Sequence, residues 1–231
     1  MSDKKEYRQA RFVRPDGATE ILLVRHGESR AASADNLFPL VDGQGDPELA
    51  QAGQEQAKKL ARRLANHPID AVYVTNLRRT HETAAPLCER RQLTPGVIAD
   101  LREVHLGDWE GGLFRIKAHQ GDPSFLAMQQ KQEWGEIPGA ETNAQLNERV
   151  ARGLQQVISA HPDQLVMVVV HGGVIGSILH QATGSHPFAF TGADNGSVSH
   201  LVAHEGRIIL RRFNDTSHLS SRIVADTTMP T

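Results

Sequence analysis

Two apolar segments of the sequence run directly into a histidine that is followed by glycine. The stretch ILLVRHGES places four apolar residues before Arg25, His26 and Gly27, and LVMVVVHGG repeats the pattern at His171. Arginine presents a planar fork that matches phosphate oxygens, and a glycine beside the histidine lets a ligand approach closely. After His171, Gly172 opens a predicted helix, whose free N–H groups and positive end favour an anion. These residue types predict a local anion site.

Two further segments carry groups that could serve such a site. Arg78 and Arg79 stand in the first turn of a predicted helix, where cations are mildly unfavourable, so we expect one of them to meet an anion. Glu103 is the candidate proton donor, because nearby Trp109 and other apolar residues could raise its pKa. Taken singly, each of these residues is more often an ordinary loop or helix residue. The hypothesis therefore depends on the whole set.

Composition limits the classes of function. The chain has 231 residues and a net charge of −2, so nothing in its overall charge indicates a general affinity for nucleic acid or for an anionic membrane. The longest apolar run is about six residues, far too short to cross a bilayer. The N-terminus lacks the apolar core of a secretory signal. Cys88 is the single cysteine, so we expect no intrachain disulfide, no cysteine-based zinc site and a cytoplasmic location.

Short apolar segments alternate with amphipathic segments along most of the chain. This alternation predicts an α/β fold, a three-layer sandwich with a mostly parallel central sheet and helices on both faces. The predicted strands cover residues 20–24, 69–76, 96–100 and 164–170, the helices cover 46–68, 77–92, 140–162 and 172–184, and a hairpin covers 197–213. We expect 164–170 to be central and 96–100 to lie at an edge. Ligand sites of such sheets form at the carboxyl ends of the strands.

Local signals refine these elements. Asp46 is the expected N-cap of the first helix, and Pro86 is expected to bend or restart the second. Thr142 and Gln145 have the spacing of a capping box. The predicted hairpin turns at Glu205 and Gly206.

The expected organisation is one catalytic domain over 20–213, with an N-terminal extension over 1–19 and a C-terminal tail over 214–231. The alternation lapses over about 105–141, which we expect to be a small insertion above the site. Its aromatic residues could line a pocket: Trp109, Phe114, Phe125 and Trp134. His105 is expected to have a structural or rim role.

The motifs LLVRHGES, TNLRRTHETA, LREVHLGDWEG and VVVHGGV together resemble the histidine phosphatase superfamily, in the branch that contains the cofactor-dependent phosphoglycerate mutases. The resemblance covers about residues 20–204. It implies that His26 is a nucleophile phosphorylated on nitrogen and that Glu103 protonates the leaving oxygen. Arg25, Arg79 and His171 then complete the phosphate pocket. Such a pocket supplies its own positive charge, so no metal and no cofactor is expected.

Further residues match the family less specifically. Gly27, Ser29 and Gly172 are expected to contact substrate. Asn195 matches an asparagine near the family's active site, although asparagine before glycine is equally a turn signal.

The sequence also departs from the family pattern. Ala32 stands where an asparagine is usual, and Asn36 could replace it from a longer loop. Thr75 and Asn76 replace the usual Ser-Pro or Ser-Asp pair, and Ala50 replaces a common threonine. The tryptophan-rich segment and the paired-arginine substrate clamp of the mutases are not found.

The expected function is therefore a phosphomonoesterase that acts on a small phosphorylated metabolite through a phosphohistidine. A mutase-type phosphotransfer is the alternative, and a non-catalytic phospho-ligand-binding module is a weaker one. A metallohydrolase is weaker still, because no carboxylate has ligand spacing near either histidine. The expected partner is a small-molecule phosphate monoester, with no nucleic acid and no membrane, and a homodimer remains open.

Overall fold

The computed structural model describes residues 7–220, and the outer parts of the predicted extension and tail, 1–6 and 221–231, lie outside the described residues. A six-stranded sheet has the order β5-β4-β6-β1-β7-β8. The strands are β1 (Thr19–Arg25), β4 (Ala71–Val74), β5 (Gly96–Val97), β6 (Leu165–Val170), β7 (Val198–His204) and β8 (Arg207–Asp215). β5, β4, β6 and β1 pair in parallel, and β7 and β8 extend the sheet antiparallel.

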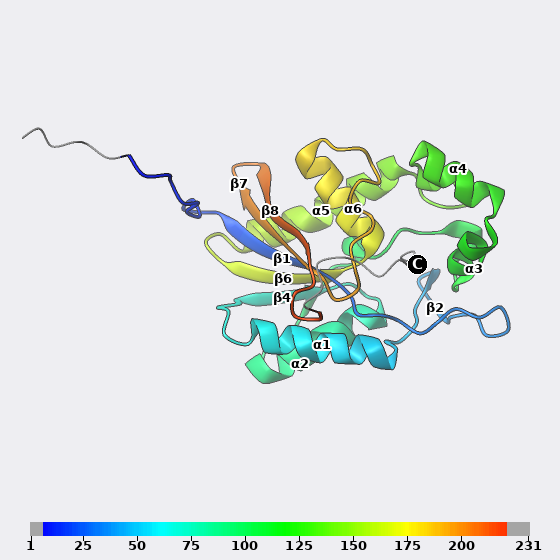
Figure 1. The fold of residues 1–231 in the computed structure, drawn as a ribbon, viewed down its shortest axis with the longest axis horizontal. Coiled ribbons are helices and arrows are strands. Elements are labelled where there is room, and N and C mark those ends of the chain that lie inside the picture. Colours follow the sequence, from blue (N-terminus) through cyan, green and yellow to red (C-terminus); the bar gives the residue numbers. More distant parts are fainter. Residues whose placement is uncertain (1–6, 221–231) are drawn as a thin grey trace, which may run out of the picture.

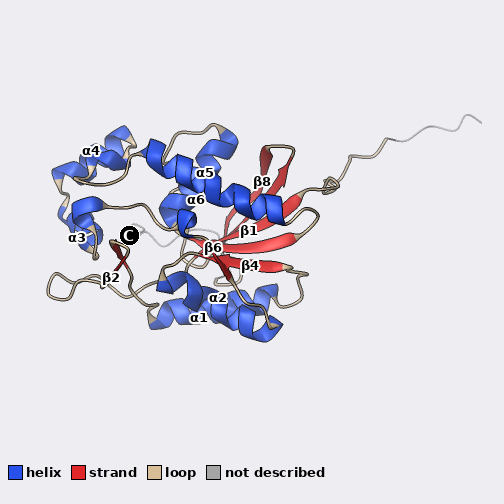
Figure 2. Cartoon of the chain, turned by 180° about the vertical axis from the view of Figure 1, so that it is seen from behind, coloured by secondary structure: helices blue, strands red, loops and turns tan. Residues whose placement is uncertain are grey.

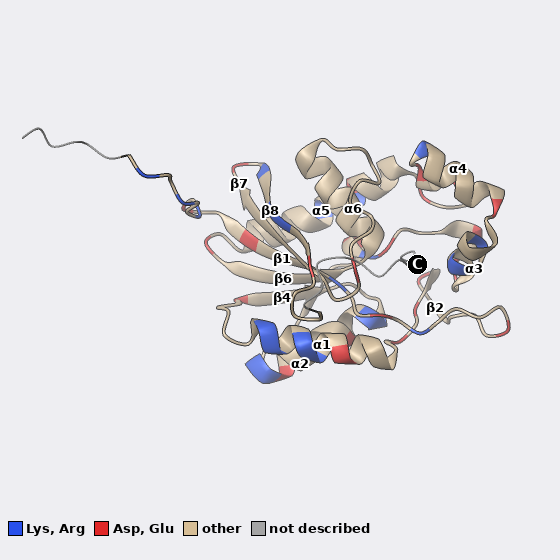
Figure 3. Cartoon of the chain, in the orientation of Figure 1, with Lys and Arg blue, Asp and Glu red and all other residues tan. Residues whose placement is uncertain are grey.

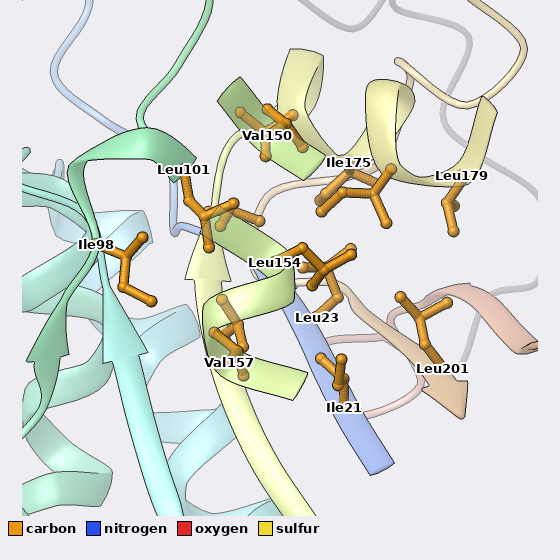
Figure 4. Packing of buried hydrophobic residues seen from close by; sticks show 14 of the residues in the cluster. Ile21, Leu23, Ile98, Leu101, Val150, Leu154, Val157, Ile175, Leu179 and Leu201 are labelled. Carbon is orange, nitrogen blue, oxygen red and sulfur yellow. The ribbon is translucent and has the colours of Figure 1, made fainter. Parts of the chain in front are cut away.

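Helices cover both faces of this sheet (Figures 1 and 2). α1 (Gln51–Leu64) and α2 (Arg78–Arg91) lie on one face, and α5 (Asn143–Ala160) and α6 (Gly172–Thr183) lie on the other. Because side chains alternate along a strand, Leu22 and Val24 pack towards α1 and α2, whereas Ile21 and Leu23 pack towards α5 and α6. Figure 4 shows the second of these cores. The predicted three-layer sandwich is confirmed.

Charged residues are absent from the two strands at the middle of the parallel part, β4 and β6, whereas helices, loops and the outer strand β8 carry them (Figure 3). All six residues of β6 are buried, as expected for the central strand of a sheet covered on both faces. β5 lies at one edge, as predicted, but it has only two residues and is followed by the short helix η1 (Ala99–Leu101).

The segment between η1 and α5 lies beyond the carboxyl ends of the parallel strands (Figure 1). It contains η2 (Gly107–Trp109), α3 (Leu113–Gln120), α4 (Pro123–Lys131) and η3 (Trp134–Glu136). These elements surround a small apolar core of Trp109, Met128 and Ile137. A second excursion, the hairpin of β2 (Leu40–Val41) and β3 (Gln44–Gly45), approaches the same edge.

Two local predictions need correction. The first helix begins at Gln51 rather than at Asp46, because Ala50 is extended and its N–H donates to Glu28 O (2.9 Å) instead of to a helical carbonyl. Asp46 instead accepts from the N–H of Arg78 (2.7 Å), at the start of α2. Pro86 lies inside α2, which continues from Arg78 to Arg91, so the expected restart is wrong and the expected bend stays a prediction.

Other local signals are confirmed. The capping box of Thr142 and Gln145 starts α5, and Glu205 and Gly206 form the hairpin turn with positive φ angles of 46° and 73°. β8 continues to Asp215, where Arg63 of α1 donates to Asp215 Oδ1 (3.1 Å) and to Ser217 Oγ (2.8 Å). These contacts attach residues beyond the expected boundary at 213 to α1. Over residues 7–220, no helix has both the length and the apolar character that crossing a bilayer requires.

The contact of α1 with the loop after β1 gives a stability prediction. A Cβ on Gly53 would lie 2.0 Å from the backbone oxygen of Glu28. We expect Gly53→Ala to lower the free energy of unfolding by about 1–3 kcal/mol through overpacking, although alanine otherwise favours a helix interior by roughly 1 kcal/mol. Urea unfolding measures the change. Gly192→Ala is the control, because nothing lies within 4 Å of its Cβ position. A Gly53→Ala protein more stable than the wild type would contradict this packing.

Candidate active site

The carboxyl ends of β1 and β6 bring two histidines together. His26 follows β1, and its backbone N–H donates to Val170 O at the end of β6 (3.0 Å). His171 follows Val170 directly, and its ring meets the His26 ring edge-on, with centroids 5.2 Å apart. The adjacency predicted from the two motifs is therefore present.

One hydrogen bond fixes the tautomer of His26. Nδ1 lies 2.7 Å from the carbonyl oxygen of Gly27, which can only accept, so Nδ1 carries the proton. Nε2 is left with its lone pair and accepts from Arg79 Nε (3.2 Å). Burial, followed by the charges of Arg79 and Arg25, holds the pKa of His26 well below its usual value of 6.5. The imidazole therefore remains neutral and nucleophilic at neutral pH.

The two adjacent arginines of α2 have different surroundings. Arg79 is 7% exposed, and besides His26 it donates from Nη1 to Gly45 O (2.9 Å). Burial lowers its pKa to about 10, which still leaves it charged at neutral pH. Arg78 is exposed and pairs with Glu82 (2.5 Å). Arg79 is thus the arginine that faces the two histidines.

Arg25 is also buried, and burial lowers the pKa of its guanidinium. It donates from Nη1 to the carbonyl oxygen of Ala193. Its Nε is buried and has no hydrogen-bond partner in the described part of the chain. An unpaired buried donor costs about 1–3 kcal/mol, so this N–H favours an incoming acceptor.

His171 is completely buried and lies behind His26 rather than on the wall of the cavity. Its Nε2 lies 3.1 Å from Thr75 Oγ1. Thr75, one of the two residues that differ from the usual Ser-Pro or Ser-Asp pair, therefore contacts the site. Burial, Arg79 and His26 keep the pKa of His171 well below 6.5.

Glu103 follows η1 and lines the same cavity as His26. Its Oε1 accepts from two backbone N–H groups, those of Val104 (3.0 Å) and Gly173 (3.1 Å). Burial raises the pKa of the carboxyl, against the lowering effects of the Val104 N–H and of Arg79 and Arg25. Because Oε1 already accepts two hydrogen bonds, the acidic proton belongs on Oε2.

Arg25, His26, Arg79 and Glu103 line a cavity of about 140 Å³. That volume is small beside the roughly 300–1,000 Å³ of drug-sized ligand sites. The β2–β3 hairpin contributes Gln44 and Gly45, and the segment between η1 and α5 closes the remainder. The lining residues are Arg25, His26, Phe38, Gln44, Gly45, Pro47, Arg79, Glu103, Val104, Leu106, Trp109, Glu110, Gly112, Phe114, Arg115 and Trp134. Phe125 is not among them and packs behind Phe114, with ring centroids 5.9 Å apart.

Arg115 of α3 is a pocket residue that the sequence analysis missed. It donates from Nη2 to Ser29 Oγ (2.7 Å) and from Nη1 to Arg30 O (2.9 Å). Burial, followed by the charge of Arg25, lowers its pKa. A basic residue inside the apolar stretch LFRIK was the available signal. Ser29, expected to contact substrate, accepts this hydrogen bond and does not line the cavity.

The other residues expected to contact substrate are also absent from the cavity wall. A Cβ on Gly27 would lie 2.6 Å from Gly53 O, so the space beside His26 admits α1 rather than a ligand. A Cβ on Gly172 would lie 3.3 Å from Thr191 O. Asn195 donates from Nδ2 to the carbonyl oxygen of His26 (3.0 Å). These residues support the site from behind and do not line its cavity.

Two remaining residues, Asn36 and His105, do not line the cavity. Asn36 is exposed and does not line the cavity, so it does not replace the missing asparagine at Ala32. His105 accepts from the Gly107 N–H at Nδ1 (3.2 Å), a contact within its own turn. Within residues 7–220, no group of three or more His, Cys, Asp or Glu side chains is arranged to hold a metal ion.

A family model and curated relatives place the chain among the same kind of proteins. A family model of the histidine phosphatase superfamily (branch 1) matches residues 21–216. A metal-independent phosphoserine phosphatase of Arabidopsis thaliana is 32% identical and covers 94% of this chain and 91% of its own length. Phosphoserine phosphatase 1 of Hydrogenobacter thermophilus is 31% identical, over 87% of this chain and 94% of its own.

Solved structures agree. The native structure of mycobacterial glucosyl-3-phosphoglycerate phosphatase has a TM-score of 0.70 and 26% identity, and covers 86% of this chain and 100% of its own. A phosphoglycerate mutase from Bacillus anthracis shares the fold with a TM-score of 0.72 at 22% identity, over 88% of this chain and 96% of its own. The resemblance and the fold class expected from the sequence are both confirmed.

The contact between Glu103 and α6 gives the prediction of this section. A Cβ on Gly173 would lie 2.4 Å from Val104 Cγ2 and 2.7 Å from Glu103 Oε1. We expect Gly173→Ala to displace the carboxyl and lower kcat/KM on an alkyl phosphate by about 10²-fold. Gly176→Ala is the control, because its Cβ would meet Thr191 Cγ2 (2.6 Å) and not Glu103. A Gly173→Ala enzyme as active as the wild type would show that this close packing does not matter.

Proposed function

Because the chain belongs to the histidine phosphatase superfamily (branch 1), we propose that it hydrolyses a small phosphate monoester through a phosphohistidine at His26. The observation that carries this proposal is the unprotonated Nε2 of a buried, neutral His26, which accepts a hydrogen bond from the guanidinium of Arg79. A lone pair held among cations suits attack on an anionic phosphoryl group, because the cations neutralise the electrophile while the imidazole remains unprotonated.

In the first step, Nε2 of His26 attacks phosphorus in line with the leaving oxygen. The new N–P bond forms as the P–O bond to the alcohol breaks, and Glu103 transfers its proton to the departing oxygen. The raised pKa of Glu103 favours the protonated carboxyl that this step requires.

In the second step, water attacks phosphorus on the face that the alcohol has left. The Glu103 carboxylate takes the proton of the water, the N–P bond breaks, and inorganic phosphate leaves with the free enzyme restored. Arg25 and Arg79 stabilise the charge on the equatorial oxygens in both steps, and the unpaired Nε–H of Arg25 is a ready donor.

We further propose that the substrate carries a second anionic group. Arg115 of α3 adds a third guanidinium to the cavity, and Ser29 and Arg30 hold it in place. Two relatives named as phosphoserine phosphatases act on a monoester with a carboxylate. A phosphorylated amino or hydroxy acid would suit both the small cavity and this third cation.

Other expectations stay proposals. Phosphoglycerate mutase activity is the alternative, and it would move phosphate between the hydroxyls of glycerate instead of releasing it. We place the reaction in the cytoplasm, on the ground that Cys88 is a buried free thiol in the described chain. A homodimer remains open.

The nucleophile gives the principal test. We expect His26→Ala to reduce hydrolysis of p-nitrophenyl phosphate to background, because no other histidine lines the described cavity. Chelators should leave the wild-type rate unchanged. His119→Ala, at an exposed position of α3, is the matched control and should keep full activity. Substantial turnover in His26→Ala would refute the phosphohistidine route.

Substrate selection gives a second test. Phosphoserine and phosphoethanolamine differ only by a carboxylate. We expect Arg115→Met to raise KM for phosphoserine by about 10–100-fold, the loss of one charge-assisted hydrogen bond, and to change KM for phosphoethanolamine little. Lys117→Met, on the same helix and paired with Asp122, is the control. Equal losses on both substrates would assign Arg115 to the phosphoryl group instead.

A further inference from the structure

Arg149 of α5 uses all of its hydrogen-bonding capacity next to the active site. A guanidinium has five N–H donors. Nη1 donates to the carbonyl oxygens of Asp100 (2.9 Å) and Arg102 (2.7 Å), and Nη2 donates to that of Glu103 (2.7 Å). The remaining two N–H groups bind the carboxylate of Glu141, with Nε 3.0 Å from Oε2 and Nη2 on Oε1. Three carbonyls of the loop that carries Glu103 are therefore held by one side chain.

The fold sets Arg149 in this position. The capping box at Thr142 starts α5, and Glu141 lies directly before that cap. One turn beyond Arg149, a Cβ on Gly153 would lie only 3.0 Å from Asp100 Cβ and from the Leu101 side chain. The glycine thus lets α5 approach η1 closely enough for the guanidinium to reach the carbonyls. The Arg149–Glu141 pair is largely buried, with side chains 11% and 12% exposed.

The carbonyl oxygen of Glu103 accepts a second hydrogen bond, from the β2–β3 hairpin. Gln44 of the β2–β3 hairpin donates from Nε2 to Glu103 O (2.6 Å) and is itself 2% exposed. The backbone of Glu103 is therefore bound from α5 and from the hairpin, while its carboxyl is bound by the N–H groups of Val104 and Gly173.

We propose that Arg149, together with Glu141, is a positioning residue that sets where Glu103 presents its proton to the leaving oxygen. The inference rests on the proposed function, because it assigns a partner to the acid of that reaction. Arg149 does not line the cavity, so it acts through the loop and not on the substrate.

The physical reason is the short range of proton transfer. A general acid works at hydrogen-bond distance from the atom it protonates, and a displacement of about 1 Å can cost 10²-fold. A loop between two short 3₁₀ helices has little stiffness of its own. Five charge-assisted bonds from a residue anchored in an 18-residue helix supply that stiffness.

The test uses two substrates that differ in their need for the acid. p-Nitrophenolate leaves readily without a proton, whereas the alkoxide of phosphoserine does not. We expect Arg149→Met in the full-length protein to lower kcat/KM for phosphoserine by about 10²-fold and to change kcat/KM for p-nitrophenyl phosphate little. kcat/KM is the suitable readout, because it reports the step in which the leaving oxygen departs.

Two variants keep the test decisive. Arg149→Lys preserves the charge but not the five-donor fork, and it reports the same split should Arg149→Met fold poorly. Arg152→Met is the matched control: it lies one turn along α5 and contacts the Asp100 carboxylate (3.4 Å), with a side chain 55% exposed. We expect Arg152→Met to leave kcat/KM unchanged for both substrates.

A double variant tests whether Arg149 acts through Glu103. In a Glu103→Gln background, Arg149→Lys should cause no further loss on phosphoserine, because the group that it positions is already gone. Equal losses on the two substrates in both Arg149 variants, or an additive loss in the double variant, would overturn the proposal. The proposed function fails separately, through activity retained in His26→Ala.

Discussion

The site depends on one constraint: a neutral histidine must stay buried among cationic guanidinium groups. Burial and the charges of Arg79 and Arg25 both disfavour protonation of His26. The carbonyl oxygen of Gly27 accepts a hydrogen bond from Nδ1–H, which keeps the proton on Nδ1 and leaves Nε2 unprotonated. A neutral imidazole thus tolerates cationic neighbours that an imidazolium would repel, and the same cations attract a phosphoryl group. Because the imidazole of His26 is neutral, one pocket can hold both the nucleophile and the cations that bind the anion.

Much of the surrounding packing supports that constraint. Gly27 and Gly53 let α1 approach the loop that carries His26, and a Cβ on either glycine would clash with backbone. Gly173 similarly lets α6 contact Glu103. The acid Glu103 and the nucleophile His26 therefore come from segments about eighty residues apart in the chain, each fixed by a close helix contact. Glycines near this site serve helix packing more than ligand access.

The sequence predicted the parts of the site that follow directly from strands. Apolar runs ending at Arg25 and His171 identify strand ends, and parallel strands bring their carboxyl ends to one edge. It did not predict Arg115 or Arg149, because both act across long separations in sequence, from helices whose orientation no local pattern specifies. Asp46 illustrates the same limit: its residue type indicated a cap, but tertiary packing decided that it caps α2 and not α1.

The stereochemical course at phosphorus tests the central claim most directly. A phosphate monoester made chiral at phosphorus with sulfur and oxygen isotopes would be hydrolysed in isotopically labelled water. Two successive in-line displacements, first by His26 and then by water, each invert phosphorus, so the account predicts overall retention of configuration. Overall inversion would mean that water attacks the substrate directly, and it would contradict a covalent role for His26.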